Sequence, residues 1–311
     1  MTELRESLVS DKPPFTSLLL IVLVLVMGWG VVGPLIGFSA ASLVYDGTLE
    51  QLKDQFESTQ PEEKAFAAFM IMQAAASFIG LILLPALYIR FSQQKPLVPF
   101  FKKESQLPMV GLLICLLGLA AIIAMYPVTK WNMDVHFPEW MSGFENWARK
   151  LENKGVVFTK FMTDFDSPIE FVLGLFIIAV LPAIGEEFVF RGLIQHELWR
   201  SGRNIHVAIW VSAILFSAIH LQFFGFFPRV LLGALFGYLY YWSGNLLIPM
   251  IAHFFNNAFS LTMLYLYNEG VSKVDMDVNT SIPIPLVAIC MVITFGLLYY
   301  FRKHYLTQQN T

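Results

Sequence analysis

Long apolar segments recur along the whole of this 311-residue chain. A helix needs about 20 mostly apolar residues to cross the ~30 Å hydrocarbon core of a bilayer. Inside that core the backbone must satisfy its own hydrogen bonds, which favours helices over open strands. The pattern predicts an all-α, polytopic membrane bundle of about eight transmembrane helices. Their approximate bounds are Ser17 to Phe38, Ala65 to Ile89, Pro108 to Met125, Ile169 to Trp199, His206 to Leu221, Arg229 to Trp242, Leu246 to Tyr267 and Pro283 to Phe301.

The composition supports a membrane protein and argues against other classes. Hydrophobic residues make up 56% of the chain and charged residues only 14%, which does not suit an ordinary soluble domain. The net charge of -3 provides no basic surface for nucleic acid. The only cysteines, Cys115 and Cys290, cannot assemble a disulfide framework or a four-thiolate zinc site. We expect both to be buried free thiols.

Basic residues are distributed unevenly between the two sides of an eight-span arrangement. Segments on the cytoplasmic side of a membrane are typically enriched in Lys and Arg. With the N-terminus inside, the short outside segments carry only Lys53, Lys64, Arg229 and Lys273. We therefore predict that both termini are cytoplasmic, and that the first span is retained because it lacks a cleavage pattern. The basic residues of the short inside segments are Arg5, Lys12, Arg90, Lys95, Lys102, Lys103, Arg200, Arg203, Arg302 and Lys303.

Polar residues of chemical interest are concentrated in one part of the chain. The long segment before this part contains Trp131, Trp140 and Trp147, which are typical of the headgroup boundary. We interpret it as a structural interfacial loop, with a substrate gate as the alternative. The chain is accordingly divided into residues 1–167 (three spans and the loop), 168–267 (a functional core) and 268–311 (the last span and a polar tail).

Three short strings place ionisable or amide side chains inside the core spans. EEFVFR contains Glu186, Glu187 and Arg191. Ionisable residues at bilayer depth are costly, and they mark catalytic or transport sites. The strings are therefore a candidate site. The other two are FSAIH, with Phe216 and His220, and HFFNN, with His253 and Asn257.

The spacing of the first two strings predicts that they meet. Glu186 lies 16 residues before Gly202, and His220 lies 18 residues after it. A turn at Gly202 or Arg203 places both side chains about 25 Å from the turn, at ~1.5 Å rise per residue. Two residues that are distant in sequence thus become neighbours in an antiparallel helix pair.

A second turn brings the third string to the same depth if the first hairpin projects about 10 Å further into the water. Ser243 to Asn245 separates two apolar segments, and His253 stands about 13 Å above this turn at the same rise per residue. Asn257 follows His253 by four residues. The two side chains therefore share a helix face and can address one substrate atom.

Taken together, the three strings resemble the EExxxR, FxxxH and HxxxN motifs of the CPBP (Abi) family. This family includes the CAAX prenyl endopeptidases and bacteriocin-processing or immunity proteins. The likeness covers about Pro168 to Tyr267. It implies an intramembrane endopeptidase in a bacterial plasma membrane, acting on a membrane-associated peptide or protein that is prenylated or unmodified.

The resemblance also implies a role for each motif residue. Glu186 and His220 would activate the attacking water. His253 and Asn257 would stabilise the developing oxyanion, as donors in a dry site commonly do. The residues that would support the site are Glu187, Arg191 and Phe216.

A metal-free mechanism is favoured for this site. The alternative is a zinc ion held by Glu186, His220 and His253, with an open fourth position. A metal bound to Glu186 would, however, prevent this carboxylate from acting as the base. The chain also lacks the HExxH helix of many zinc peptidases.

Other readings of the same residues remain open at this stage. A buried Glu and His pair can relay protons in a transporter. An immunity or scaffold protein can retain the strings without catalysis. Glu187 and Arg191, four residues apart, also suit a purely structural ion pair.

Overall fold

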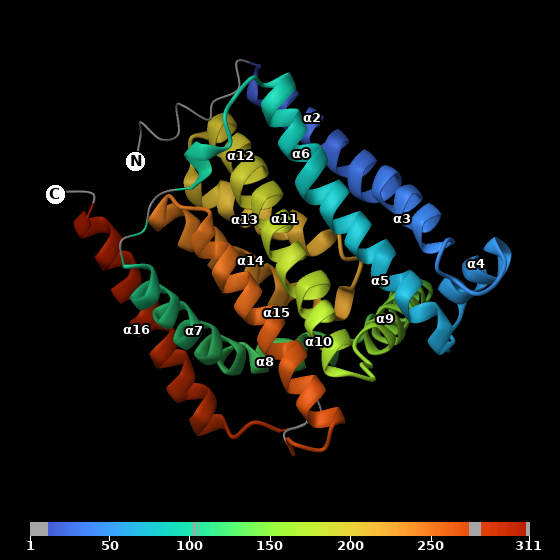
Figure 1. Cartoon of the computed structure of the whole chain (residues 1–311). Coiled ribbons are helices and arrows are strands. Elements are labelled where there is room, and N and C mark those ends of the chain that lie inside the picture. The colour runs from blue at the N-terminus through green and yellow to red at the C-terminus, as the bar shows by residue number, and fades with distance from the viewer. Residues whose placement is uncertain (1–11, 102–103, 105, 274–280, 309–311) are drawn as a thin grey trace.

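The structure is a computed structural model that describes residues 12–101, 104, 106–273 and 281–308. Within these ranges every regular element is helical and no β-strand occurs. The predicted all-α fold class is confirmed. The α-helices, labelled as in Figure 1, are α2 Pro14–Met27, α3 Gly33–Ala41, α4 Leu49–Glu57, α5 Phe66–Ala75, α6 Leu84–Leu87, α7 Leu107–Ala124, α8 Tyr126–Met133, α9 Ser142–Met162, α10 Pro168–Gly174, α11 Leu181–Glu187, α12 Gln195–Gly202, α13 Ile205–Ala218, α14 Phe226–Ser243, α15 Leu247–Asn268 and α16 Ile284–Gln308.

Short π-helical segments join several of these helices into longer ones. Three of these segments are followed two residues later by a proline, namely Pro34, Pro85 and Pro182. Proline lacks an N–H group and its ring displaces the carbonyl one turn earlier, so the preceding turn widens. The π-helical segments are Gly28–Val32, Ala76–Leu83, Tyr88–Ser92, Leu175–Val180 and Phe188–Ile194; the 3-10 segments are Glu63–Ala65, Val98–Phe100, Glu139–Met141 and Phe223–Gly225.

Among the described residues, seven continuous helices are long and apolar enough to cross a membrane. The chain is therefore an integral membrane protein. Each of these helices corresponds to one of the predicted spans. Their bounds are Pro14–Ala41, Glu63–Ser92, Leu107–Ala124, Pro168–Gly202, Phe223–Ser243, Leu247–Asn268 and Ile284–Thr307.

The span expected from His206 to Leu221 is shorter than predicted. Helix α13 has 14 residues and ends at Ala218, which makes it about 21 Å long at ~1.5 Å per residue. Leu221 has a φ of +55°, in the left-handed region, and turns the chain before α14 begins. The expected eight transmembrane helices are thus seven long helices and one short one in the described part of the chain.

Two further expectations have different outcomes. Both cysteines are free as predicted, but only Cys290 is buried, whereas Cys115 is partly exposed. The orientation of the termini stays a prediction. Of the residues used for it, Arg5, Lys102 and Lys103 lie outside the described residues.

The helices are arranged around a central group formed by α11, α13, α14 and α15 (Figure 1). α3 packs against α5 on one side of this group, and α7 packs against α16 on the other. The buried side chains of α2, the π-helical segment after α11 and the start of α15 form one continuous core, which includes Ile21, Phe190 and Met250. This core fixes the helices that carry the motif residues.

A glycine lets the long helix Pro168–Gly202 approach the Glu63–Ser92 span closely. A β-carbon added to Gly185 would lie only 2.5 Å from the β-carbon of Leu81. Real β-carbons do not approach one another so closely, hence any larger residue would push the two helices apart. Glu186 and Glu187 follow immediately and are held by this tight contact.

The segment expected as an interfacial loop is mostly helical. It forms α8 and α9, which pack against the connection between α13 and α14. The Asn132 amide donates to Phe223 O at 3.0 Å and accepts from Phe227 N at 2.9 Å. The Glu152 carboxylate accepts from Phe224 N at 3.2 Å. The chain that follows His220 is thereby anchored from outside the functional core.

Candidate active site

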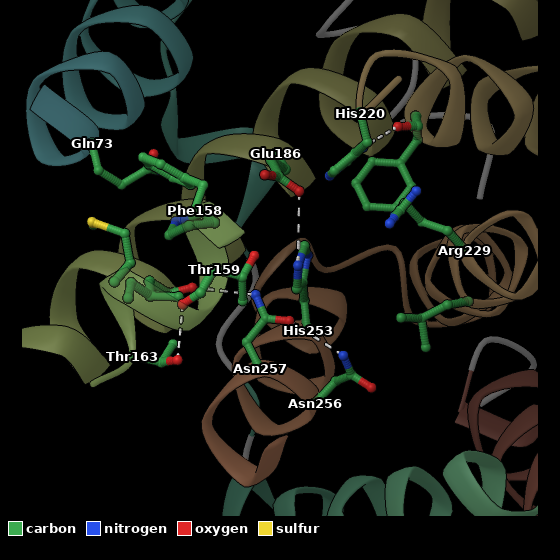
Figure 2. Close-up of a pocket in the computed structure, with 15 residues that line it drawn as sticks. Gln73, Phe158, Thr159, Thr163, Glu186, His220, Arg229, His253, Asn256 and Asn257 are labelled. Carbon is green, nitrogen blue, oxygen red and sulfur yellow. Dashed lines mark hydrogen bonds and ion pairs between the residues drawn. The ribbon is translucent and has the colours of Figure 1, made fainter. Parts of the chain in front are cut away.

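The four expected catalytic residues line a single cavity of about 340 Å³ (Figure 2). Glu186 is at the end of α11, His220 follows α13, and His253 and Asn257 lie on α15. Three separate helical segments therefore supply the polar groups of one site. The other lining residues are Gln73, Phe158, Thr159, Met162, Thr163, Ile178, Pro182, Phe216, Arg229, Leu232 and Asn256.

Two left-handed residues make the turns that bring these segments together. Helix α12 ends at Gly202, and Arg203 follows with a φ of +54°. The Asn204 side chain then accepts from His206 N and Val207 N and so caps α13. The second turn has Gly244 at a φ of +61°, a conformation that glycine adopts without strain. Both turns lie where the sequence predicted them.

Glu187 is the centre of a buried polar network. Its Oε1 accepts from Arg191 Nη1 and from His253 Nδ1, both at 2.8 Å. Arg191 Nη2 also donates to Gly233 O at 2.9 Å. Glu187 and Arg191 have side-chain exposures of 0% and 1%. Because an unpaired buried charge is very costly, each of these ions requires the other.

The ring of His253 is held by aromatic packing and by a hydrogen bond at Nδ1. It stacks on Phe236 at a centroid distance of 5.1 Å and meets the edge of Phe216 at 6.0 Å. Its Nδ1 is bound to Glu187, and its Nε2 lies 3.8 Å from Glu186 Oε2. His253 thus bridges a sealed carboxylate and one that faces the cavity.

His220 is oriented in a similar way but by a different partner. Its Nδ1 donates to Phe216 O at 2.8 Å, since a carbonyl oxygen can only accept. The Phe216 ring also packs against the His220 ring at 5.2 Å. Both imidazoles therefore carry the Nδ1 proton in their neutral form and leave Nε2 available as a base.

Asn257 has an amide that is only weakly engaged. Its Nδ2 lies 3.5 Å from Ile178 O, at the limit of a hydrogen bond. Its Oδ1 accepts from Asn256 Nδ2 at 3.2 Å, which orients the amide with its nitrogen as the donor. The Asn257 N–H groups can therefore turn to a substrate oxygen at little cost.

The donor set does not form a three-ligand metal site in this structure. In the described part of the chain, no group of three or more His, Cys, Asp or Glu side chains is close enough to hold a metal ion. His253 Nδ1 is bound to Glu187, whereas its Nε2 faces Glu186. The zinc alternative with Glu186, His220 and His253 stays a prediction.

Sequence reasoning missed several residues that line the cavity. Thr159 and Thr163 lie on α9 or directly after it, in the segment expected to be an interfacial loop. Their spacing of four residues was a usable signal, because it places them on one helix face. Gln73 and Asn256 also line the site. Arg229 was counted only as a basic residue of an outside segment.

Comparisons with known proteins agree with the motif residues. Residues 168–259 match the family described as type II CAAX prenyl endopeptidase Rce1-like. A stretch of 85 residues is 32% identical to the uncharacterized protein YpbD of Bacillus subtilis and covers 26% of this chain and 40% of that protein. A stretch of 111 residues is 30% identical to the membrane-embedded CAAX protease MroQ of Staphylococcus aureus and covers 34% and 44% of the two chains.

These likenesses are confined to the functional core. The aligned stretches span less than half the length of either curated relative. No solved structure matches the chain significantly. Residues 168–259, which carry all of the motif residues, are thus similar to the Rce1-like type II CAAX prenyl endopeptidases, and one relative of this stretch is a membrane-embedded CAAX protease.

Proposed function

We propose that this protein is an intramembrane endopeptidase that hydrolyses a peptide bond with a water molecule activated inside the helical bundle. The observation that best supports this is the shared cavity of Glu186, His220, His253 and Asn257. A carboxylate, two imidazoles and an amide around one cavity are the groups that amide hydrolysis requires.

Glu186 is the proposed general base, assisted by His220. Unlike Glu187, Glu186 has no ion-pair partner within 3.5 Å among the described residues and faces the cavity. Its carboxylate takes a proton from water as the water oxygen bonds to the substrate carbonyl carbon. His220 Nε2 accepts the second hydrogen bond of this water and fixes its direction of attack.

His253 and Asn257 are the proposed donors to the oxyanion. When its Nε2 is also protonated, His253 carries a positive charge that the Glu187 carboxylate stabilises through Nδ1. The Nε2–H group and the Asn257 amide then donate to the tetrahedral oxygen. As the carbon–nitrogen bond breaks, Glu186 returns its proton to the leaving amine, and the products are a carboxylic acid and an amine.

The proposed substrate is a membrane-associated peptide or protein, because the cavity lies within a bundle of membrane-spanning helices. The matched family is described as a CAAX prenyl endopeptidase and one relative as a CAAX protease, so a prenylated cysteine peptide is the first candidate. Both relatives are bacterial. We therefore propose the bacterial plasma membrane as the location, with both termini in the cytoplasm.

The full chain reconstituted in liposomes tests this function. The probes are a quenched fluorescent CAAX peptide with a farnesylated cysteine and the same peptide without the farnesyl group. Glu186→Gln should reduce cleavage by about a hundredfold or more, as expected for the loss of a general base. The unfolding temperature in detergent should remain that of the wild type.

Glu269→Gln is the matched control, since Glu269 is an exposed carboxylate just after the same α15 that carries His253. It should cleave as fast as the wild type. Equal activity of Glu186→Gln and wild type would exclude the proposed base. Faster cleavage of the farnesylated probe would support a prenylated substrate, and equal rates would argue against prenyl recognition.

A further inference from the structure

Among the described residues, one cation that lines the cavity has no counter-ion. Arg229, in the first turn of α14, lines the same space as Glu186 and His253. Its Nη2 donates to Gln222 Oε1 at 2.7 Å. Its Nη1 is buried and has no hydrogen-bond partner, and it forms no ion pair with a described residue. A buried N–H group of a guanidinium is costly to leave unpaired unless an anion accepts its hydrogen bond.

Arg191, which is fully buried beside the cavity, is paired differently. Arg191 is neutralised by Glu187 and also donates to Gly233 O. Within the described part of the chain, Arg229 has only the neutral Gln222 amide as a hydrogen-bond partner. The carboxylates whose charges act on it are Glu152 and Glu186, and neither forms an ion pair with it. The charge of Arg229 is thus available to a ligand.

The guanidinium is held in place by α9. A β-carbon added to Gly155 would lie 2.5 Å from Gln222 Nε2, so the Gln222 side chain lies directly across Gly155. A β-carbon on Gly225 would lie 3.1 Å from Arg229 Nη2. Glycines at both positions therefore leave room for a preorganised Gln222–Arg229 pair, which keeps Nη1 fixed.

The cavity also has two chemically different ends. In Figure 2, Glu186 and His253 lie between Arg229 on one side and the neutral polar side chains of Gln73 and Thr159 on the other. A peptide that spans the cavity would present its middle to Glu186 and one end to Arg229. A guanidinium pairs best with a carboxylate.

We propose that Arg229 binds a carboxylate of the substrate and thereby determines which peptide bond lies opposite Glu186. The carboxylate belongs to the C-terminus of the substrate or to an acidic side chain near the cleaved bond. Arg229 is then a specificity-determining residue. This inference rests on the proposed endopeptidase function.

Matched peptide pairs test the role of Arg229 in the reconstituted full chain. The first pair is the farnesylated probe as a free acid and as its C-terminal amide. The second pair is amidated and carries Glu or Gln at the residue after the cleaved bond. The wild type should favour the anionic member of one pair by about tenfold or more in kcat/KM, mainly through KM. The pair that shows the preference identifies the source of the carboxylate.

Arg229→Gln should bring this preference close to one, whereas Arg229→Lys should retain part of it because the charge remains. Arg302→Gln removes an exposed arginine of α16 and should keep the full preference. An unchanged preference in Arg229→Gln would overturn the inference. An equal loss on both members of each pair would also overturn it, since Arg229 would then act on the oxyanion or the fold.

A second variant tests the role of Arg229 if Arg229→Gln does not fold. A binding measurement tests it if no cleavage is observed. If Arg229→Gln unfolds, Gly225→Val should displace the guanidinium and weaken the preference. Binding of the labelled peptides to Glu186→Gln protein needs no cleavage. Tighter binding of the anionic peptide there, without any cleavage by the wild type, would support Arg229 and reject the proposed function. Equal binding of both members would reject the role of Arg229.

Discussion

The two carboxylates beside the His253 ring, Glu187 at Nδ1 and Glu186 near Nε2, lie in different environments. On the sealed side, Glu187 and Arg191 are 0% and 1% exposed and their charges neutralise each other. On the cavity side, Glu186 is 14% exposed and lies 3.8 Å from the ring. The two glutamates are adjacent in sequence, yet the helix turns one inward and the other towards the cavity. The sealed side therefore positions the imidazole, and we propose that the open side reacts.

The largest effect on the sealed side is expected for Arg191→Met. It leaves the buried Glu187 carboxylate without its cation and should lower the free energy of unfolding by about 3–5 kcal/mol. Denaturation in detergent measures this loss.

The double variant Arg191→Met, Glu187→Met separates the effect of the buried ion pair on stability from its effect on cleavage. It should recover most of the stability, because two apolar side chains replace a buried ion pair. It should not recover peptide cleavage, since His253 loses the acceptor of its Nδ1 proton. Recovery of both properties would mean that Glu187 has no positioning role.

The next largest effect is expected for Asn257, on the cavity side of His253. Asn257→Ala should reduce kcat by about a hundredfold or more, the usual cost of one oxyanion donor, with little change in stability. Ser260→Ala is the control, because Ser260 is a small polar residue at an exposed position of the same α15. It should reduce kcat much less. Similar losses in the two variants would contradict the proposed donor.

A smaller effect is expected outside the functional core. Asn132 is 3% exposed and both of its hydrogen bonds hold the connection after His220. Asn132→Ala leaves two backbone groups unsatisfied and should cost about 1–3 kcal/mol, measured by thermal unfolding. Asn153→Ala, at an exposed position of α9, should cost much less. If the two variants are equally stable, α8 does not anchor this connection.

The smallest effect concerns Glu145 and Arg149, an ion pair of α9. The Phe137 backbone N–H and the Arg149 side chain lower the pKa of Glu145 from 4.5 to about 2. A lowered pKa in the folded state gives stability that is present above about pH 4.5 and is lost as pH falls through about 2. Glu145→Gln should thus unfold at a lower temperature than the wild type at pH 6, and the difference should shrink at pH 2.

Glu139→Gln, an exposed carboxylate near the start of the same helix, provides the control. Its unfolding temperature should follow that of the wild type at both pH values. A constant difference between Glu145→Gln and the wild type would show that this pKa does not govern the stability of the segment.

The sequence allowed much of the site to be predicted, because hairpin spacing follows from helix rise alone. Glu186 and His220 were placed at nearly equal distances from the turn at Gly202, and both line one cavity. The partner of His253 could not be predicted in this way. Whether its Nδ1 meets Glu187 depends on how α11 is rotated, which is set by the contact of Gly185 with Leu81.

Hydropathy was less informative about the ends of helices and about amphipathic segments. It extended α13 to Leu221, although the chain turns after Ala218. It also predicted a loop where the structure has α9, because a charged helix at an interface contains no long run of apolar residues. The division into three parts stays a prediction, and Thr159 shows that residues from the first part line the cavity of the second.

The shortness of α13 has a consequence for the surrounding lipids. Its outer surface exposes Val207, Trp210 and Ile214, yet the helix is about 21 Å long and a typical hydrocarbon core is about 30 Å thick. Hydrophobic mismatch of this kind is relieved when the bilayer thins locally. Acyl chains beside α13 should therefore be compressed, and activity in liposomes should rise as the acyl chains are shortened.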